Sequence, residues 1–266
     1  MQKMPVYFLS HGGGPWLWLM DEMGDSYGLL HRSLQDIPAH LPKKPKAMLV
    51  VSGHWEEEDF TVMAHPNPPM IYDYSGFPEK TYHIHYKAPG APTFAHRIMG
   101  LLASAGIGAS ENTMRGYDHG VYTIAYPMYP DADVPIIQLS IQRDYSPEAH
   151  MAVGRVLAPL REEGILIIVS GMNYHDLCFP RDAKEKSRLF DRWITQTLTG
   201  QTGQKRSKLL TAWESAPAAR FAHPREDHFI PLMIATGAAE DDTATVIYNE
   251  LLMGMVFTSS YRFDAK

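Results

Sequence analysis

Residues 165–175 read ILIIVSGMNYH, an apolar run that ends in small residues and is followed by His175. The same pattern occurs twice more, where VYFLS leads to His11 and MLVVSG leads to His54. A short apolar run bounded by small residues predicts a buried strand. In an open α/β sheet the carboxyl ends of the strands lie at one edge, and ligands bind there. The three runs therefore predict three histidines at the ligand-binding edge of a sheet.

Strands and helices are predicted to alternate along the rest of the chain. Strands are expected at residues 6–10, 47–52, 134–141, 165–170, 243–248 and 254–259. Helices are expected at residues 93–104, 146–163, 183–198 and from His228 to about residue 235. This alternation predicts an α/β fold, a single domain with a mostly parallel central sheet flanked by helices on both faces. The short connection between the last two strands predicts a hairpin at one edge of the sheet.

Length and composition favour one soluble domain spanning residues 1–266. The chain shows no linker or repeat, and its formal net charge is −6 with no cluster of Lys and Arg, so no nucleic-acid partner is expected. The single cysteine, Cys178, excludes an internal disulfide framework and a cysteine-based zinc site. No apolar run approaches the roughly 18 residues of a membrane span, and the N-terminal apolar stretch is too short for a signal peptide. We therefore expect a cytoplasmic protein without a membrane partner, and the sequence leaves homo-oligomer formation open.

Several histidines offer the donor set that a divalent transition metal prefers, because neutral imidazoles that converge on one point are good ligands. His11 and His54 are candidates at the strand ends. The later segment AHPREDHFIPL, residues 222–232, offers Glu226, Asp227 and His228. A three-histidine site would use His228, whereas a two-histidine, one-carboxylate ferrous site would use an acidic residue of this segment. The residues alone leave both arrangements open, and His223 of the same segment is interpreted as a loop histidine.

Two further histidines are candidates for acid–base chemistry. His175 could act as a general base toward a substrate hydroxyl or as a fourth metal ligand. His119, in RGYDHGVY, directly follows Asp118, which we expect to orient its ring or to raise its pKa.

The stretch from residue 66 to residue 92 is irregular and rich in proline and aromatic residues. A loop of this length in a compact domain is usually functional or disordered, and its aromatic content argues against disorder. Its aromatic side chains could form the wall of a pocket for a planar ligand, or they could anchor the loop to the domain. They are Tyr72, Tyr74, Phe77, Tyr82 and Tyr86.

A second motif would predict a different chemistry. HGGG also occurs in the oxyanion hole of some α/β-hydrolases, and residues 24–28 match the G-x-S-x-G nucleophile elbow. The elbow serine should lie between an apolar strand and a helix, but the preceding residues, LMDEM, do not form such a strand. The match is therefore interpreted as a turn bounded by glycines.

With these residues identified, the chain resembles the class III extradiol ring-cleaving dioxygenases of the LigB superfamily. It is most similar to the branch related to the 4,5-DOPA extradiol dioxygenases. Seven segments in order carry the resemblance: FLSHGGGPW, VVSGHW, YDYSGFPEKTYHIHYKAPGAP, RGYDHGVY, MYPDADVPIIQLSI, LAPLREEGILIIVSGMNYHDL and EDHFIPL.

The resemblance implies extradiol ring cleavage of a catechol, DOPA-like or other, with O2. It implies that His11, His54 and His228 bind one divalent metal per chain, Fe(II) for dioxygenase activity or Zn(II) as bound. It makes His175 the acid–base residue, or a fourth ligand when zinc is bound, and His119 a contact to substrate or O2. More distant relatives complete the ligand set with a carboxylate, so a ligand from Glu226 or Asp227 stays open.

The chain departs from the pattern of its relatives at three places. It has HGGGP where many have His-Gly-Ser/Thr-Pro, Asp227 where many have Glu, and Asp176 where many have Asn. Two other functions stay open. One is a zinc-dependent hydrolase or lyase on the same scaffold, because zinc accepts the same imidazoles and one fold hosts many chemistries. The other is a non-catalytic relative that binds a partner protein.

Overall fold

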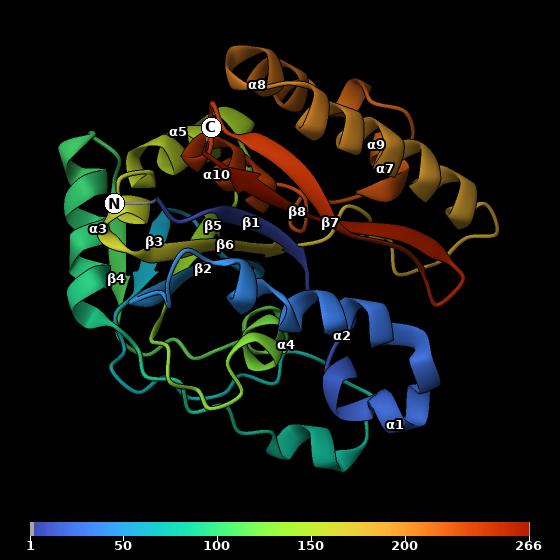
Figure 1. Cartoon of the computed structure of the whole chain (residues 1–266), viewed down its shortest axis with the longest axis horizontal. Coiled ribbons are helices and arrows are strands. Elements are labelled where there is room, and N and C mark those ends of the chain that lie inside the picture. The colour runs from blue at the N-terminus through green and yellow to red at the C-terminus, as the bar shows by residue number, and fades with distance from the viewer. Residues whose placement is uncertain (1–2, 266) are drawn as a thin grey trace.

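An eight-stranded sheet runs through the described part of the molecule in the order β4-β3-β5-β2-β6-β1-β8-β7 (Figure 1). The structure is a computed structural model that describes residues 3–265, so both ends of the predicted domain 1–266 lie outside the described residues. The strands are β1 (Val6–Ser10), β2 (Ala47–Glu57), β3 (Phe60–Met63), β4 (Ala109–Asn112), β5 (Ile136–Gln142), β6 (Ile165–Gly171), β7 (Thr243–Leu252) and β8 (Val256–Asp264).

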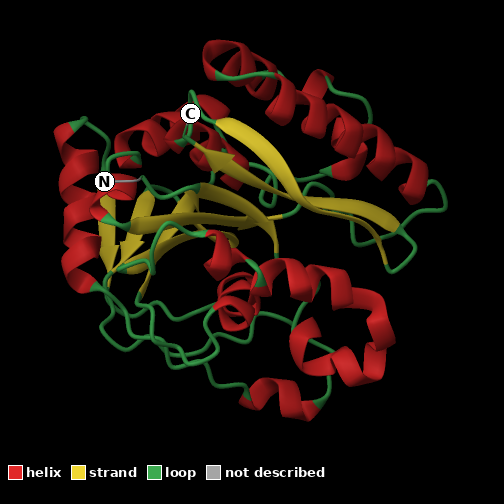
Figure 2. Ribbon diagram, viewed as in Figure 1, coloured by secondary structure: helices red, strands yellow, loops and turns green. Residues whose placement is uncertain are grey.

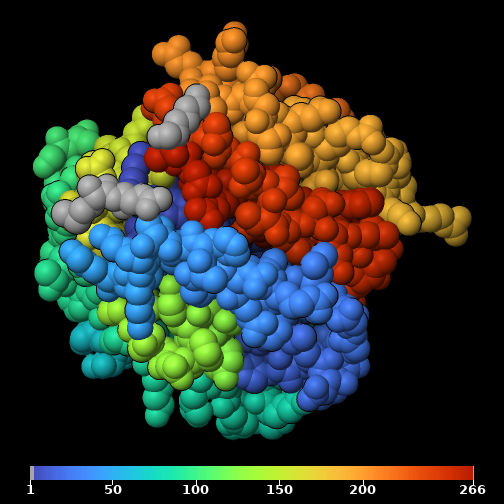
Figure 3. All heavy atoms as spheres, viewed as in Figure 1, coloured from blue at the N-terminus to red at the C-terminus, as the bar shows by residue number. Residues whose placement is uncertain are grey.

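The sheet is mostly parallel, which confirms the predicted fold class. Strand β2 pairs in parallel with both β5 and β6, β1 pairs in parallel with β6, and β3 with β4. The antiparallel pairings are β3 with β5, β1 with β8, and β7 with β8. The last two strands form the predicted hairpin at the edge of the sheet, and Figure 3 shows this hairpin (red) at the surface between the orange helices and the blue N-terminal region.

Helices cover both faces of the sheet, as Figure 2 shows. The α-helices are α1 (Met20–Met23), α2 (Gly28–Gln35), α3 (Pro92–Ser104), α4 (His119–Met128), α5 (Pro147–Leu157), α6 (Leu160–Glu163), α7 (Ala183–Gly200), α8 (Gly203–Thr211), α9 (Ala219–Ala222) and α10 (Pro231–Ala238). Short 3-10 helices are η1 (Trp16–Leu19), η2 (Gly24–Tyr27), η3 (Ile37–His40), η4 (Glu79–His83) and η5 (Trp213–Ser215). No helix in residues 3–265 combines the length and the apolar character needed to cross a membrane.

Side chains that alternate along each strand build two separate cores. In β1, Val6 and Phe8 pack with the layer that contains α3, α5, α7 and α10. Their neighbours Tyr7 and Leu9 pack on the opposite face with α2 and α4. Burial on both faces explains why the central strands appear in the sequence as continuous apolar runs rather than as alternating patterns.

The predicted helix at residues 146–163 is divided in the structure. Its start is as expected, because the Ser146 hydroxyl accepts a hydrogen bond from the backbone N–H of Ala149 at 3.2 Å. The division into α5 and α6 falls at Pro159, whose ring removes a backbone donor and crowds the preceding turn. Gly164 ends α6 with φ of 93°, a left-handed conformation that glycine adopts easily.

His54 lies inside β2 and not in a turn beyond it, which corrects the strand end expected at residue 52. Strand β2 continues to Glu57, although its pairing with β6 stops at Ser52. Its pairing with β5 changes register between Val51 and Glu56. His54 therefore occupies an interruption in the ladder, where a strand bends and can redirect a side chain.

The segment before α10 packs directly onto the ends of two strands. The backbone N–H of Met172 donates a hydrogen bond to the carbonyl oxygen of His228 at 3.0 Å. A Cβ atom at Gly171 would lie 2.4 Å from that same oxygen, and one at Gly53 would lie 2.8 Å from the carbonyl oxygen of Asp227. Glycine at both positions therefore allows the segment to approach the sheet edge.

His223 lies in the loop after α9, as expected, but it is fully buried there. Its ring lies among aromatic side chains, with centroids 5.0 Å from Phe229, 5.3 Å from Phe190 and 6.1 Å from Trp213. Neither ring nitrogen has a hydrogen-bond partner among residues 3–265. Burial and the nearby histidines lower the pKa of His223 to about 3, so the ring is neutral at pH 7.

We expect the substitution His223→Leu to make the protein less sensitive to acid. Below pH 6.5 His223 becomes protonated in the unfolded chain, whereas in the folded protein it stays neutral down to about pH 3. As the pH is lowered through this window, His223 decreases the wild-type free energy of unfolding by about 1.4 kcal/mol per pH unit. The leucine variant has no titrating group at this position and lacks this decrease. Urea unfolding at pH 7 and pH 5 measures the difference.

His150 provides the control. It is also fully buried, but its ring accepts a hydrogen bond from the Gln142 backbone N–H at 3.1 Å and lies 2.7 Å from the Ser146 carbonyl oxygen. His150→Leu should therefore destabilise the protein already at pH 7, whereas His223→Leu should not. If the free energy of unfolding of His223→Leu depended on pH as that of the wild type does, the low pKa of His223 in the folded protein would be contradicted.

Candidate metal centre

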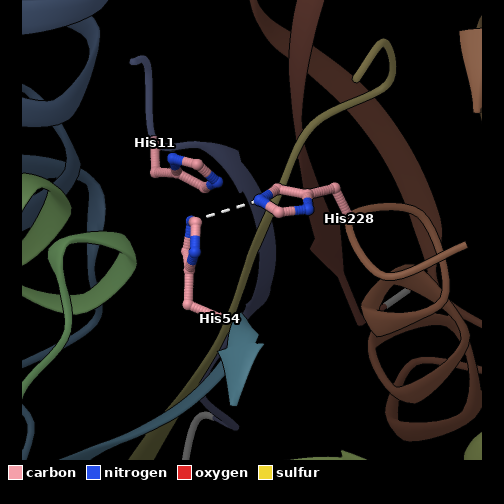
Figure 4. Close-up of side chains that lie close together, drawn as sticks. All are labelled: His11, His54 and His228. Atoms are coloured by element: carbon pink, nitrogen blue, oxygen red, sulfur yellow. Dashed lines mark hydrogen bonds between the residues drawn. The ribbon is translucent and has the colours of Figure 1, made fainter. Parts of the chain in front are cut away.

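His11, His54 and His228 point toward one another at the edge of the sheet (Figure 4). One ring nitrogen from each lies within 4.8 Å of the other two. The Nε2 atoms of His54 and His228 are 3.1 Å apart, and the ring centroids of His11 lie 4.9 Å from His54 and 5.1 Å from His228. We call these three residues the imidazole cluster.

The chain around His11 shows why glycine follows it. Gly12 has φ of 72°, and a Cβ atom there would lie 2.6 Å from the indole ring of Trp16. The same indole donates a hydrogen bond from Nε1 to the His11 carbonyl oxygen at 2.7 Å. The turn after β1 therefore folds back over the tryptophan, and this contact holds the backbone from which the His11 ring projects.

The imidazole cluster is uncharged at neutral pH. Burial, followed by the neighbouring histidines, lowers the pKa of His11 and of His54 well below the ordinary value. Burial and the proximity of His175 lower the pKa of His228 to about 4. Neutral imidazoles carry the free lone pair that a metal requires.

The hydrogen bonding of the cluster also fits a metal ion. Both ring nitrogens of His11 are buried without a partner among the described residues. Buried polar atoms in folded proteins normally have partners, and each one left without any costs stability. A divalent cation between the three rings would bind one of these two nitrogens together with one nitrogen from each of the other rings, so the donor set fits one transition-metal ion.

Asp73 joins the cluster to His119, and the sequence did not indicate it. Asp73 Oδ1 accepts hydrogen bonds from His119 Nδ1 at 2.8 Å and from the His119 backbone N–H at 3.0 Å. Its Oδ2 lies 3.3 Å from His54 Nδ1. Burial raises the pKa of Asp73, but the contacts with His119 outweigh it and hold the pKa below its ordinary value. The only signal in the sequence was one acidic residue in the aromatic segment YDYSGF.

Asp118 does not orient His119, so this part of the expectation from their adjacency was wrong. Its carboxylate accepts hydrogen bonds from the Ser52 hydroxyl and from Arg115, both at 2.8 Å. Gly120 completes this packing, because a Cβ atom there would lie 2.5 Å from Ser52 Oγ and 2.9 Å from His54 Cδ2. Asp118 thus braces the start of α4 against β2.

On the other side of the cluster, Asp227 contacts both His228 and His175. Asp227 Oδ1 lies 3.2 Å from His228 Nδ1 and 3.8 Å from His175 Nδ1. The rings of His175 and His228 stack with centroids 3.4 Å apart. Burial raises the pKa of Asp227, but its contacts with the two histidines outweigh burial and keep it ionised. Glu226 points elsewhere and pairs with Arg220 at 2.6 Å.

A cavity of about 640 Å³ opens onto these residues. Its lining includes all five histidines, that is, the imidazole cluster with His119 and His175. A volume of this size is typical of sites for small organic ligands. The sequence-predicted histidines therefore share one cavity, although they come from positions 11 to 228 of the chain.

The aromatic loop at residues 66–92 serves both purposes that the sequence left open. Tyr74 and Phe77 line the cavity. Tyr86 anchors the loop to the domain, because its hydroxyl donates a hydrogen bond to the carbonyl oxygen of Tyr129 at 3.0 Å. The Tyr72 hydroxyl instead donates a hydrogen bond within the loop, to the carbonyl oxygen of Ile84 at 2.7 Å.

Comparison with known proteins identifies the family. The chain matches the family model described as the catalytic LigB subunit of aromatic ring-opening dioxygenase over residues 5–264. It is 37% identical to a 4,5-DOPA dioxygenase extradiol from Beta vulgaris, over 98% of this chain and 96% of that protein. It is 35% identical to a 4,5-DOPA dioxygenase extradiol from Escherichia coli K12, over 89% and 85% of the two chains.

A solved structure shows the same architecture. The crystal structure of an uncharacterized protein from Escherichia coli K12 superposes with a TM-score of 0.79 and 29% sequence identity, covering 98% of this chain and 99% of that one. The chain therefore belongs to the LigB family of aromatic ring-opening dioxygenases and is an extradiol dioxygenase, an oxidoreductase whose family uses a single metal, a catecholic substrate and O2.

Proposed function

We propose that this protein, as one catalytic domain, opens the ring of a catechol with O2 at a single divalent metal held by His11, His54 and His228. The observation that carries the proposal is the buried, neutral imidazole cluster, whose nitrogens converge at one end of a ligand-sized cavity. Three imidazoles favour this ligand set over one with a carboxylate, because Asp227 contacts the Nδ1 atoms of His228 and His175 whereas His228 Nε2 faces His54.

His11, His54 and His228 would hold a ferrous ion, which would supply a common centre for the catechol and O2 and so remove much of the entropic cost of their encounter. Cleavage of the ring carbon–carbon bond beside the diol incorporates both atoms of O2. The reaction therefore needs no external reductant, and the product is a semialdehyde.

His175 is proposed to take the proton of a catechol hydroxyl and to return it later. Asp227 faces its Nδ1 atom, which leaves Nε2 to exchange the proton. His119 donates a hydrogen bond from Nδ1 to Asp73, which leaves its Nε2 atom to face substrate or O2. The two histidines approach the cluster from different elements, His175 after β6 and His119 at the start of α4.

We expect anaerobically purified protein to bind one divalent metal per chain and, with Fe(II), to consume O2 in the presence of a catechol. In the variant His11→Ala, the metal affinity and the activity should each fall by about 100-fold or more, because a ligand is removed from a three-ligand site. Metal analysis and an oxygen electrode measure both, with a panel of catechols that includes DOPA. Turnover that needs the metal but not O2 would instead support the zinc-dependent hydrolase or lyase.

His175→Ala should separate proton transfer from metal binding. We expect its metal content to equal that of the wild type and its kcat to fall by roughly 10²–10⁴-fold, as for the loss of a general base. Added imidazole should restore part of the rate, because a free base can enter the space left by the ring. A variant that loses its metal as well would mean that His175 is a ligand.

Asp73→Asn should weaken metal binding by roughly 10- to 100-fold, because the carboxylate that faces His54 Nδ1 fixes the ring and raises its basicity. Competition with a chromophoric chelator measures the affinity without turnover. Asp118→Asn is the matched control, since Asp118 is adjacent to His119 in sequence but its carboxylate contacts Ser52 and Arg115. Equal metal affinities in the two variants would contradict this role of Asp73.

A further inference from the structure

From the charges around the cavity we infer that the site selects catechols whose side chain is apolar or positively charged over catechols whose side chain carries a carboxylate. The inference rests on the proposed ring cleavage and specifies its substrate class. Among the described residues that line the cavity there is no lysine and no arginine. Three lining residues carry carboxylates, namely Asp73, Asp176 and Asp227.

Two of these carboxylates are already engaged inside the protein. Asp73 binds His119, and Asp227 faces His175 and His228. Arg225 lies 3.6 Å from Asp227, but it pairs with Glu56 and does not line the cavity. No lysine or arginine among the described lining residues is therefore positioned to receive a substrate carboxylate.

Asp176 is the carboxylate that stays available. It is half-buried, and its Oδ1 accepts a hydrogen bond from the Cys178 backbone N–H at 2.9 Å. Within residues 3–265 it forms no ion pair with lysine, arginine or histidine. A substrate ammonium could pair with this carboxylate, whereas a substrate carboxylate would be repelled by it.

The rest of the lining includes a large apolar share. Leu177 and Phe179 follow Asp176 in the loop after β6, and Leu252, Met253 and Val256 come from the β7–β8 hairpin. Leu177 is 70% exposed, Met253 45% and Phe179 40%. Apolar side chains of this size at the surface beside a cavity are typical of a ligand-contacting rim.

Charge and apolar surface favour the same ligands. A catechol carboxylate that enters this cavity gives up water without gaining a lysine or arginine partner, which is unfavourable. An alkyl substituent would instead cover exposed apolar surface. The cavity volume of about 640 Å³ leaves space for such a substituent beyond a single ring.

A panel of catechols with side chains of similar size tests the inference. It contains 4-propylcatechol, dopamine, 3,4-dihydroxyphenylacetate and DOPA, which carry a neutral group, an ammonium, a carboxylate and both charges. We expect kcat/KM of the Fe(II)-loaded protein to be about 10-fold or more higher for 4-propylcatechol and dopamine than for 3,4-dihydroxyphenylacetate, with DOPA between them. Calorimetric dissociation constants of the metal-loaded protein without O2 should follow the same order.

A charge introduced at the rim provides the matched variants. Met253→Lys places a cation on an exposed lining residue, and Met253→Gln has a neutral side chain at the same position. The lysine variant should raise the preference for 3,4-dihydroxyphenylacetate over dopamine by about 10-fold relative to the glutamine variant. Asp176→Asn should shift the same ratio in the same direction.

The outcomes separate this inference from the proposed function. If no catechol is cleaved, the proposed ring cleavage fails, and the order of the dissociation constants still decides the inference. If 3,4-dihydroxyphenylacetate is bound and cleaved as well as dopamine, ring cleavage stands and the inference is overturned. The anion partner would then be sought among the backbone N–H groups of Gly12, Gly13 and Gly14, which line the cavity.

Discussion

The withdrawal of three imidazoles from water is the constraint on which this site depends. His11 and His228 are almost completely buried, and burial is the largest factor that keeps each ring of the cluster unprotonated. The rings also disfavour one another's protonation, because two imidazolium ions at these distances would repel. The backbone meets this constraint by close approach, with Gly53 and Gly171 admitting the segment that carries His228. A neutral, converging donor set is the result.

Two carboxylates organise the histidines into pairs. Asp73 contacts His54 of the cluster and His119, while Asp227 contacts His228 of the cluster and His175. Each carboxylate therefore links a candidate metal ligand to a candidate for proton transfer or substrate contact. This arrangement couples ring orientation to the loops that carry the carboxylates, which are the aromatic loop on one side and the segment before α10 on the other. The electrostatic character of the cavity follows from it, because both acids add negative charge without a balancing lysine or arginine in the described lining.

Much of the fold could be predicted from local sequence. The central strands β1 and β6 were found nearly to the residue, because burial on both faces makes them continuous apolar runs. Strands β3 and β4 were missed because four residues are too few to show a period. Helix α4 was missed because almost all of its residues are buried, so it has no polar face, and because it contains Pro127. The break at Pro159 was visible in the sequence but outweighed by the apolar spacing around it.

The sequence by itself determined the residue types of the site and the strands that deliver His11, His54 and His175 to the sheet edge. It also placed the chain in its family through ordered motifs. Only the tertiary structure decided which groups meet. Asp118 is adjacent to His119 in the chain, yet its side chain turns to Ser52 and Arg115, and the partner of His119 is Asp73, 46 residues away. His223 likewise lies in a loop, yet its ring is buried among aromatic rings. Side-chain contacts of this kind depend on how distant segments pack, and that information is not contained in the spacing of residues along the chain.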